Sequence, residues 1–231
     1  MRILALITAR SNSKRLPGKN IKLLGGKPLI LWSINIAKNI SEVCDILVST
    51  DDPITAKISK DAGASVPWLR PKNLATDTSN SVDVALHALD WFETQKGAVD
   101  GILLLQPTSP FRTLEGVRSG INLFKKNKYQ SIVAVSKTDS HPMWTLKIEK
   151  DYLVPFIKNS GLGVRSQDLP PAYVVNGSFY LISPFELRTH KSFFGTKTLP
   201  LLIESPKEGL DIDTEWDFKI AEFIMANFYE N

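Results

Sequence analysis

The sequence predicts an α/β fold with a doubly wound, mainly parallel, Rossmann-like sheet. Short apolar runs such as 3–7 and 101–105 alternate about five times with longer segments that have a helical pattern. Both runs are apolar throughout, as parallel strands are when helices cover the two faces of a sheet. Each run ends abruptly in a polar loop, and the topology places these loops at one edge of the sheet, where ligands bind.

The chain is long enough to bury one sizeable core. It has 231 residues, 43% of them hydrophobic, and no Gly/Ser/Pro-rich linker divides it. We therefore expect a single domain over residues 1–231, with an irregular excursion at about residues 138–172.

The first strand, Ile3–Ile7, leads into the most informative loop, residues 8–20. This loop holds hydroxyls, amides, no acid, and four cations: Arg10, Lys14, Arg15 and Lys19. Amide donors and positive charge at the end of a buried strand suit a polyphosphate, so we interpret residues 8–20 as a triphosphate cradle, with a solvated basic loop as the alternative. No GxGxxG follows the strand and no GxxxxGK[ST] occurs, which argues against a dinucleotide site or a P-loop.

The next elements follow the same alternation. A helix begins at Pro28, and residues 45–49 form the second strand. Asp51 and Asp52 precede Pro53, a pattern typical of a helix start, so we interpret them as a cap in preference to a metal pair.

A long polar segment, residues 69–81, follows a short strand expected at residues 64–68. Long ordered loops are uncommon in compact domains unless they bind something. We therefore expect this segment, with its isolated cation Arg70, to form a wall over a base and a ribose. Ser81 is expected to cap the next helix.

The strand at residues 101–105 ends in a second polar loop, residues 106–112, which we expect to face the cradle across a cleft. The remaining regular elements are a helix at 113–124, strands at 131–136, 173–182 and 199–203, and a closing helix at 215–228.

The alternation breaks at residues 138–172. Residues 144–156 have the pattern of a hairpin that turns near Lys150 and Asp151. The excursion carries exposed-looking aromatic residues: Trp144, Tyr152 and Phe156. Because such a segment cannot bury itself on one sheet edge, we predict that it is a subunit contact.

Asp211 and Asp213 are the candidate metal ligands. If this segment is extended, a period of two places both carboxylates on one face and directs Ile212 into the core. Two hard oxygen ligands together with phosphate oxygens match the preference of Mg²⁺. Capping of the last helix by Asp213 is the alternative.

Composition limits the partners and the compartment. The net charge of +4 comes from scattered Lys and Arg residues, which suits an anionic small molecule, whereas nucleic-acid binding normally needs a basic stripe. The sole cysteine, Cys44, lies in an apolar run and is expected in the core. No apolar run approaches the ~20 residues that span a bilayer. The first strand follows Met1 directly, so we expect no signal peptide, no membrane partner and a cytoplasmic protein.

Five motifs together resemble bacterial CMP-sialic acid synthetases, the cytidylyltransferases of N-acylneuraminate and related nonulosonic acids. They are ITARSNSKRLPGKN, LRPKNLATDTSNS, LLLQPTSPFR, VVNGSFYLI and LDIDTEWD, in the family's order from residue 3 to about residue 217. The resemblance implies a nucleotidyltransferase fold and a homodimer that serves cell-surface glycan biosynthesis. It also implies a Mg²⁺-dependent reaction of CTP with an acidic nine-carbon sugar to give CMP-sugar and pyrophosphate.

The resemblance also implies roles for residues at matching positions. The catalytic positions are Arg10, Lys19 and Asp211. The nucleotide positions are Arg10, Asn12, Ser13, Lys14, Lys19, Asn20, Arg70, Ser79 and Ser81. The sugar positions are Gln106, Arg165, Tyr180, Phe193 and Phe194, with Arg165 supplied by the partner subunit, and the Mg²⁺ ligands are Asp211 and Asp213.

One position departs from the family pattern. Where sialic acid enzymes often carry a lysine after His-Pro, this chain has Trp144, which favours a less polar sugar such as a legionaminic acid. The rival within the enzyme class is 3-deoxy-manno-octulosonate cytidylyltransferase. A non-catalytic nucleotide or RNA-binding module is the rival of another class, and the paired aspartates oppose it because they would repel phosphate without a metal.

Overall fold

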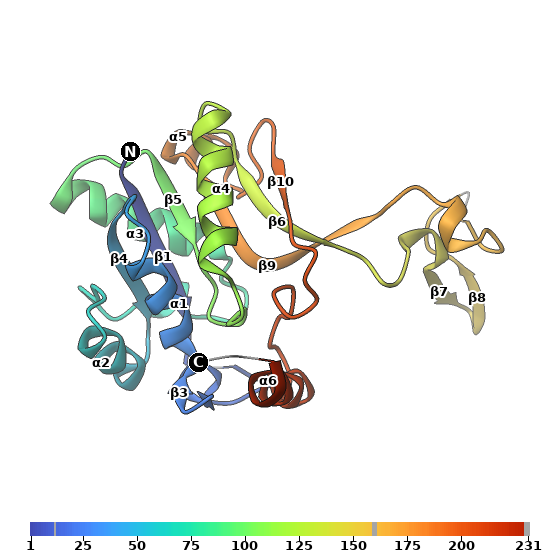
Figure 1. The fold of residues 1–231 in the computed structure, drawn as a ribbon, viewed down its shortest axis with the longest axis horizontal. Helices are drawn as coiled ribbons and strands as arrows, with labels where there is room; N and C mark the ends of the chain where they lie inside the picture. Colours follow the sequence, from blue (N-terminus) through green and yellow to red (C-terminus); the bar gives the residue numbers. More distant parts are fainter. Residues whose placement is uncertain (12, 159–160, 229–231) are drawn as a thin grey trace.

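The computed structural model describes the chain except residues 12, 159–160 and 229–231. Its centre is a six-stranded sheet in the order β10-β6-β9-β5-β1-β4 (Figure 1). The strands are β1 (Ile3–Ala9), β4 (Val43–Thr50), β5 (Gly101–Leu104), β6 (Ile132–Lys137), β9 (Tyr173–Ile182) and β10 (Leu199–Leu202). Only β9 of this sheet runs antiparallel to its neighbours, so the predicted mainly parallel α/β fold is confirmed.

Helices cover both faces of the sheet (Figure 1). The apolar residues of α1 (Leu29–Lys38), α2 (Pro53–Asp61) and α4 (Leu114–Lys126) join the core on one face. Those of α3 (Ser81–Lys96) and α5 (Pro184–His190) join the core on the other face. The first strand explains this division, because Ile3 and Ile7 pack into the first core while Leu4 and Leu6 pack into the second.

A third apolar cluster joins the two ends of the chain. The C-terminal helix α6 (Glu215–Phe228) packs beside the small β2–β3 hairpin (Leu23–Leu24 and Lys27–Pro28). Leu16 of the cradle and Ile212 belong to the same cluster, and both are buried. Burial of these two apolar anchors therefore holds the acidic segment 211–213 beside the cradle.

The excursion projects away from the sheet (Figure 1). It contains the hairpin of β7 (Leu146–Glu149) and β8 (Tyr152–Pro155), with short 3-10 helices at Pro142–Trp144 and Ser166–Asp168. Lys150 and Asp151 form the turn with φ of 49° and 68°, as the sequence predicts. Tyr152 is 74% exposed, whereas Trp144 is partly buried, and its indole N–H donates to the carbonyls of Gly161 (3.1 Å) and Val164 (3.2 Å).

Four local expectations had different outcomes. Asp52 caps α2 as predicted, by accepting from the backbone of the helix. The strand expected at residues 64–68 is only a single bridge between Ser65 and Leu47. Asn80, not Ser81, caps α3, since its side chain accepts from the N–H of Asp83 at 2.8 Å. Cys44 is exposed, because it lies at the start of β4 before the buried part of that strand.

Two short 3-10 helices lie in the loops, at Lys19–Ile21 and Lys72–Leu74. Within the described part of the chain, no helix is both long and apolar enough to cross a membrane.

Candidate active site

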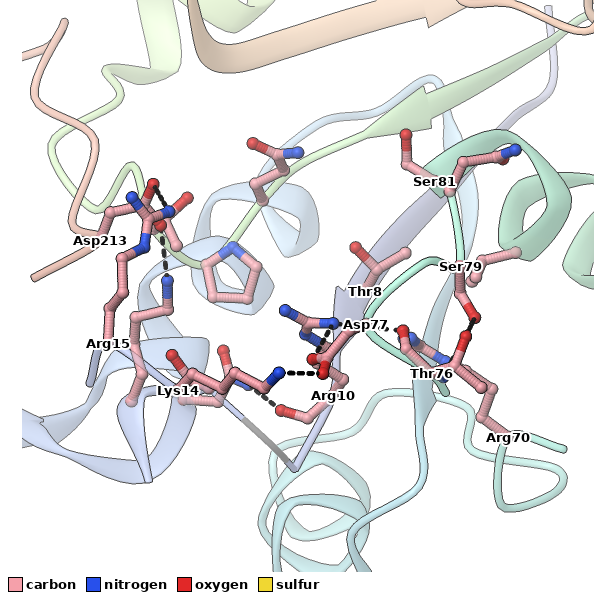
Figure 2. Close-up of a pocket in the computed structure, with 18 of the residues that line it drawn as sticks. Thr8, Arg10, Lys14, Arg15, Arg70, Thr76, Asp77, Ser79, Ser81 and Asp213 are labelled. Atoms are coloured by element: carbon pink, nitrogen blue, oxygen red, sulfur yellow. Dashed lines mark hydrogen bonds and ion pairs between the residues drawn. The ribbon is translucent and has the colours of Figure 1, made fainter. Parts of the chain in front are cut away.

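A cavity of about 600 Å³ opens where β1 and β5 end (Figure 2). Its walls come from four segments far apart in the sequence: the cradle, the 69–81 loop, the exit of β5 and the 211–213 segment. The predicted site residues that line it are Arg10, Ser13, Lys14, Lys19, Asn20, Arg70, Ser79, Ser81, Gln106, Asp211 and Asp213. The structure therefore brings the cations of the cradle and the acidic pair to one cavity.

Asp77 ties the cradle to the 69–81 loop. Lys14 Nζ lies 2.5 Å and Arg10 Nη1 lies 3.3 Å from the carboxylate of Asp77, and the two cations point toward it in Figure 2. The hydrogen bond from Lys14 holds the pKa of Asp77 below its usual value. Asn20 Nδ2 donates to the carbonyl of Arg10 at 3.0 Å, which fixes the backbone from which Arg10 projects.

Asp213 lies at the opposite side of the cradle between two cations. Lys19 Nζ is 3.0 Å and Arg15 Nη2 is 2.5 Å from its carboxylate (Figure 2). The alternative role for Asp213, capping α6, falls to other residues, because Thr214 and Asp217 exchange hydrogen bonds at the helix start. The carboxylate of Asp213 is therefore directed to the cradle.

Asp211 lies beside a kink in β9. Gly177 has φ of +77°, and a Cβ on it would lie 2.8 Å from Gln106 Oε1 and 3.8 Å from Asp211 Cγ. A residue without a side chain is thus required for β9 to approach both groups. Packing of the chain around the Asp211 carboxyl raises its pKa, an effect opposed by a hydrogen bond from Thr108 and reinforced by the charge of Asp213.

The donor set fits a divalent cation that also binds phosphate. Among the described residues, no group of three or more His, Cys, Asp or Glu side chains is arranged to hold a metal. Asp211 and Asp213 instead offer two carboxylates on one cavity, and burial raises the pKa of Asp211 although the charge of Lys19 opposes this shift. A hard cation that completes its shell with water and phosphate oxygens matches these ligands.

Arg70 forms the far wall of the cavity. It is buried, and its guanidinium donates to the hydroxyl of Ser49 at 3.0 Å and to the Ser49 carbonyl. Burial lowers the pKa of Arg70 to about 10. Ser79, which Figure 2 shows beside Thr76, accepts from the Thr76 N–H at 3.0 Å and so closes the turn that carries Asp77.

Five predicted residues lie elsewhere or outside the described residues. Asn12 lies outside them. Arg165 is an exposed residue of the excursion. Tyr180 packs against Phe193 with ring centroids 5.4 Å apart, and burial raises the pKa of Tyr180. Phe193 is 5% exposed, Phe194 is 50% exposed, and neither ring lines this cavity.

Sequence reasoning missed Arg112, a buried arginine that holds two segments beside the cavity together. Arg112 is buried and donates to Ser33 Oγ at 2.9 Å and to the carbonyls of Gln106 and Ser178. It therefore links the exit of β5 to the kink of β9, and burial lowers its pKa to about 9. The motif LLLQPTSPFR contains Arg112, but its depth in the fold could not be inferred from the loop composition.

A second cavity, of about 730 Å³, meets the first at Asp211. It lies at the ends of β6 and β10 and at the start of β9, and Asp211 is the residue that lines both hollows. The sequence analysis assigned no ligand to it.

Comparison with known proteins identifies the family. A family model described as cytidylyltransferase matches residues 4–145. The chain is 42% identical over 226 residues to CMP-N,N'-diacetyllegionaminic acid synthase of Legionella pneumophila, covering 97% of each chain. It is 33% identical over 222 residues to an N-acylneuraminate cytidylyltransferase of Streptococcus agalactiae, covering 94% of this chain and 52% of that protein, so it spans about half of that relative.

A solved structure agrees at the level of the fold. CMP:2-keto-3-deoxy-manno-octonic acid synthetase complexed with CTP has a TM-score of 0.71 and 16% identity, and the match covers 99% of this chain and 100% of that one. The resemblance stated from the sequence motifs is thereby confirmed. The chain belongs to the cytidylyltransferase family and is a nucleotidyltransferase of the CMP-sialic acid synthetase type.

Proposed function

We propose that the chain transfers a cytidylyl group from CTP to the anomeric hydroxyl of a nonulosonic acid. The hydroxyl oxygen bonds to the α-phosphorus, the bond from that phosphorus to the oxygen bridging to the β-phosphate breaks, and the hydroxyl proton is released. The products are CMP-sugar and pyrophosphate. The observation that carries this proposal is the single cavity shared by the cations of the cradle and the acidic pair Asp211 and Asp213.

The cradle binds the triphosphate in this proposal. Arg10, Lys14 and Lys19 line the cavity and are paired with carboxylates in the free chain, and phosphate oxygens would replace these carboxylates as acceptors. Charge-assisted hydrogen bonds of this kind are among the strongest available to a protein. Arg70, Ser79 and Ser81 line the opposite wall and are assigned to cytosine and ribose.

Catalysis then depends on position and charge. Phosphoryl transfer of this type asks little covalent chemistry of the protein, so alignment of the two substrates and neutralisation of developing charge supply most of the acceleration. Arg10 and Lys19 neutralise charge on the α-phosphate and on the departing pyrophosphate. Asn20 keeps Arg10 in place through the carbonyl of that residue.

Asp211 and Asp213 are proposed to hold Mg²⁺. When bound, the ion supplies charge neutralisation to the phosphates and lowers the pKa of a nearby hydroxyl. Lys19 and Arg15, which contact Asp213 in the free chain, exchange this carboxylate for phosphate oxygens when CTP binds.

The acceptor is proposed to be a legionaminic acid derivative. The support is the 42% identity to an enzyme named for CMP-N,N'-diacetyllegionaminic acid and the Trp144 substitution in the chain. Trp144 is not among the residues that line the two cavities described above, so it would act on a site of a second subunit. We accordingly propose that residues 138–172 form a dimer contact that also brings Arg165 to the partner, and that the enzyme acts in the cytoplasm.

One experiment separates these assignments. CTP is titrated with and without Mg²⁺, and pyrophosphate release is then measured with N,N'-diacetyllegionaminate, N-acetylneuraminate and 3-deoxy-manno-octulosonate. We expect Mg²⁺-dependent release that is fastest with the legionaminate. CTP binding without release for any sugar would identify a non-catalytic module, whereas preference for the octulosonate would favour the rival enzyme. Preference for N-acetylneuraminate would remove the argument from Trp144.

A further inference from the structure

Asp51 has a contact that the sequence pattern did not suggest. Asp52, its neighbour, is the residue that caps α2. The carboxylate of Asp51 accepts instead from the backbone N–H of Ser11 at 2.8 Å and from the Ser11 hydroxyl at 2.5 Å. The two residues are close because β1 and β4 are paired in parallel up to Ala9 and Thr50, so the segments that follow leave the sheet side by side. Asp51 therefore holds the start of the cradle.

The contact fixes one peptide group of the cradle at both of its polar atoms. The carbonyl of Arg10 and the N–H of Ser11 belong to the same planar peptide unit. Asn20 Nδ2 donates to this carbonyl at 3.0 Å, and Asp51 accepts from this N–H. Because side chains from two other segments hold the unit, it cannot rotate without the loss of a hydrogen bond. The direction in which Arg10 leaves the backbone is thereby set.

The end of β4 also holds the far wall of the first cavity. The backbone N–H of Arg70 donates to the carbonyl of Thr50 at 2.7 Å, and the guanidinium donates to Ser49 Oγ at 3.0 Å. Burial lowers the pKa of Arg70, and the charge of Asp51 opposes that shift. Three consecutive residues, 49–51, thus bind Arg70 on one side and the cradle on the other.

Asp51 differs in this respect from Asp77. Asp77 lines the first cavity and pairs with Arg10 and Lys14, so it competes with phosphate for these cations. Asp51 and Ser11 are not among the lining residues, and the groups that Asp51 accepts from are neutral. Loss of the Asp51 carboxylate therefore frees no cation for the ligand, but it removes order from the loop.

We propose that Asp51 is a positioning residue for CTP, which orients the peptide group between Arg10 and Ser11 and so sets the cradle relative to Arg70. The proposal rests on the CTP-dependent function proposed above. Asp51 acts without touching the nucleotide, because a loop that is ordered in the free chain loses less conformational entropy when its ligand binds.

The test compares three variants by calorimetric titration with CTP in the absence of sugar. Asp51→Ala removes both hydrogen bonds. Asp51→Asn removes the charge but keeps the geometry, because the amide oxygen can accept from the N–H of Ser11 and the amide nitrogen can donate to its hydroxyl. Asp52→Ala is the matched control, since it removes the adjacent carboxylate and its described hydrogen bonds stay within residues 50–55. Urea unfolding shows that each variant is folded.

We expect Asp51→Ala to raise the Kd for CTP about tenfold, because ordering of the loop then falls to the ligand. The loss of a negative charge beside a basic loop would by itself lower this Kd, so the sign of the change separates order from charge. Asp51→Asn should stay within about threefold of the wild type, since its geometry is kept. Asp52→Ala should lower the urea midpoint at least as much as Asp51→Ala but leave the Kd within about twofold, because it loses only a helix cap.

A double variant extends the test to the partner of Asp51. Ser11→Ala keeps the backbone bond and loses the hydroxyl bond, so it should raise the Kd by only about threefold. Added to Asp51→Ala, it should cause no further rise, because the two groups act through one contact. This variant also tests the contact if Asp51→Ala does not fold.

Four results would overturn the proposal: an unchanged or lower Kd in Asp51→Ala, an equal rise in Asp52→Ala, an equal rise in Asp51→Asn, or effects of Asp51→Ala and Ser11→Ala that add in full. Failure of the wild-type protein to bind CTP would instead remove the proposed function. The two failures are distinguishable, because the first set of results requires a wild type that binds the nucleotide.

Discussion

The first cavity is walled mainly by loops that are held together by ion pairs, whereas the wall of the second includes the ends of β6 and β10 and the start of β9, which pair with one another in the sheet. In the first, Asp77 and Asp213 each accept from two cations of the cradle. In the second, the wall includes the exposed apolar residues Tyr173, Val174, Val175 and Leu202. The difference indicates that CTP must exchange existing contacts when it binds to the first cavity, whereas strand pairing already orders part of the wall of the second without a ligand.

Replacing the ion pairs of the first cavity by contacts to the phosphates of CTP should cost little free energy. Ion pairs between accessible side chains are individually weak, because water already solvates both partners. A triphosphate with several charges, by contrast, can accept from all of the cations at once. The cradle is thus kept in order by contacts that a stronger ligand readily replaces.

The largest effect is expected when a charged group assigned to catalysis is removed from the first cavity. Asp211→Asn and Arg10→Ala should each lower kcat by about 100-fold or more, as for lost electrostatic stabilisers of a transition state. Steady-state rates of pyrophosphate release at saturating CTP and sugar measure this effect. Arg118→Ala is the control for loss of an arginine, because Arg118 lies on α4 and donates only to the carbonyl of Asn39 in the described contacts. Near-normal kcat in either site variant would refute its assigned role.

An intermediate effect is expected at Gly177, where the kink of β9 approaches Gln106 and Asp211. Gly177→Ala and Gly26→Ala both force alanine to adopt a positive φ, 77° and 75°, but only the Cβ at position 177 meets close neighbours. Both variants should lose roughly 1–3 kcal/mol of unfolding free energy in urea. Gly177→Ala should in addition lower kcat about tenfold or more, because it displaces Gln106 or Asp211. Equal activity of the two variants would show that the close approach does not matter for catalysis.

The smallest effect is expected for the loop contact of the first cavity. Asp77→Asn should lower KM for CTP by about two- to fivefold, because Arg10 and Lys14 no longer have a competing carboxylate. The gain should shrink at high salt. Asp61→Asn breaks an exposed ion pair with Lys57 on α2 and should leave this KM unchanged. A raised KM for Asp77→Asn would mean that the carboxylate orders the loop instead of competing with phosphate.

The sequence was sufficient to predict the sheet and the proximity of the cradle to Asp211 and Asp213. Fully apolar runs such as Ile3–Ile7 mark strands covered on both faces, and they are buried as predicted. The period of two across Asp211 and Asp213 correctly predicted that Ile212 points into the core, and Ile212 packs in the cluster that contains Leu16 of the cradle.

Features that depend on tertiary contacts were not predictable. The second cavity depends on the register between β6, β9 and β10, and a single sequence does not reveal which residues of neighbouring strands pair with each other. The role of Asp77 was missed since its partners are more than 60 residues away in sequence. The short run at residues 64–68 has strand-like composition, yet it makes only one bridge because it lies beyond β4 at the sheet edge.

The direction of β9 has one further consequence. Because β9 is antiparallel to β6, the excursion leaves from the end of one strand and returns at the start of the other, and Thr138 bonds to Ala172 where the two stems meet. Lys137, Thr138 and Tyr173 in these stems also line the second cavity. The distant hairpin is therefore joined to the sheet by two hydrogen-bonded stems that also form part of the wall of this cavity.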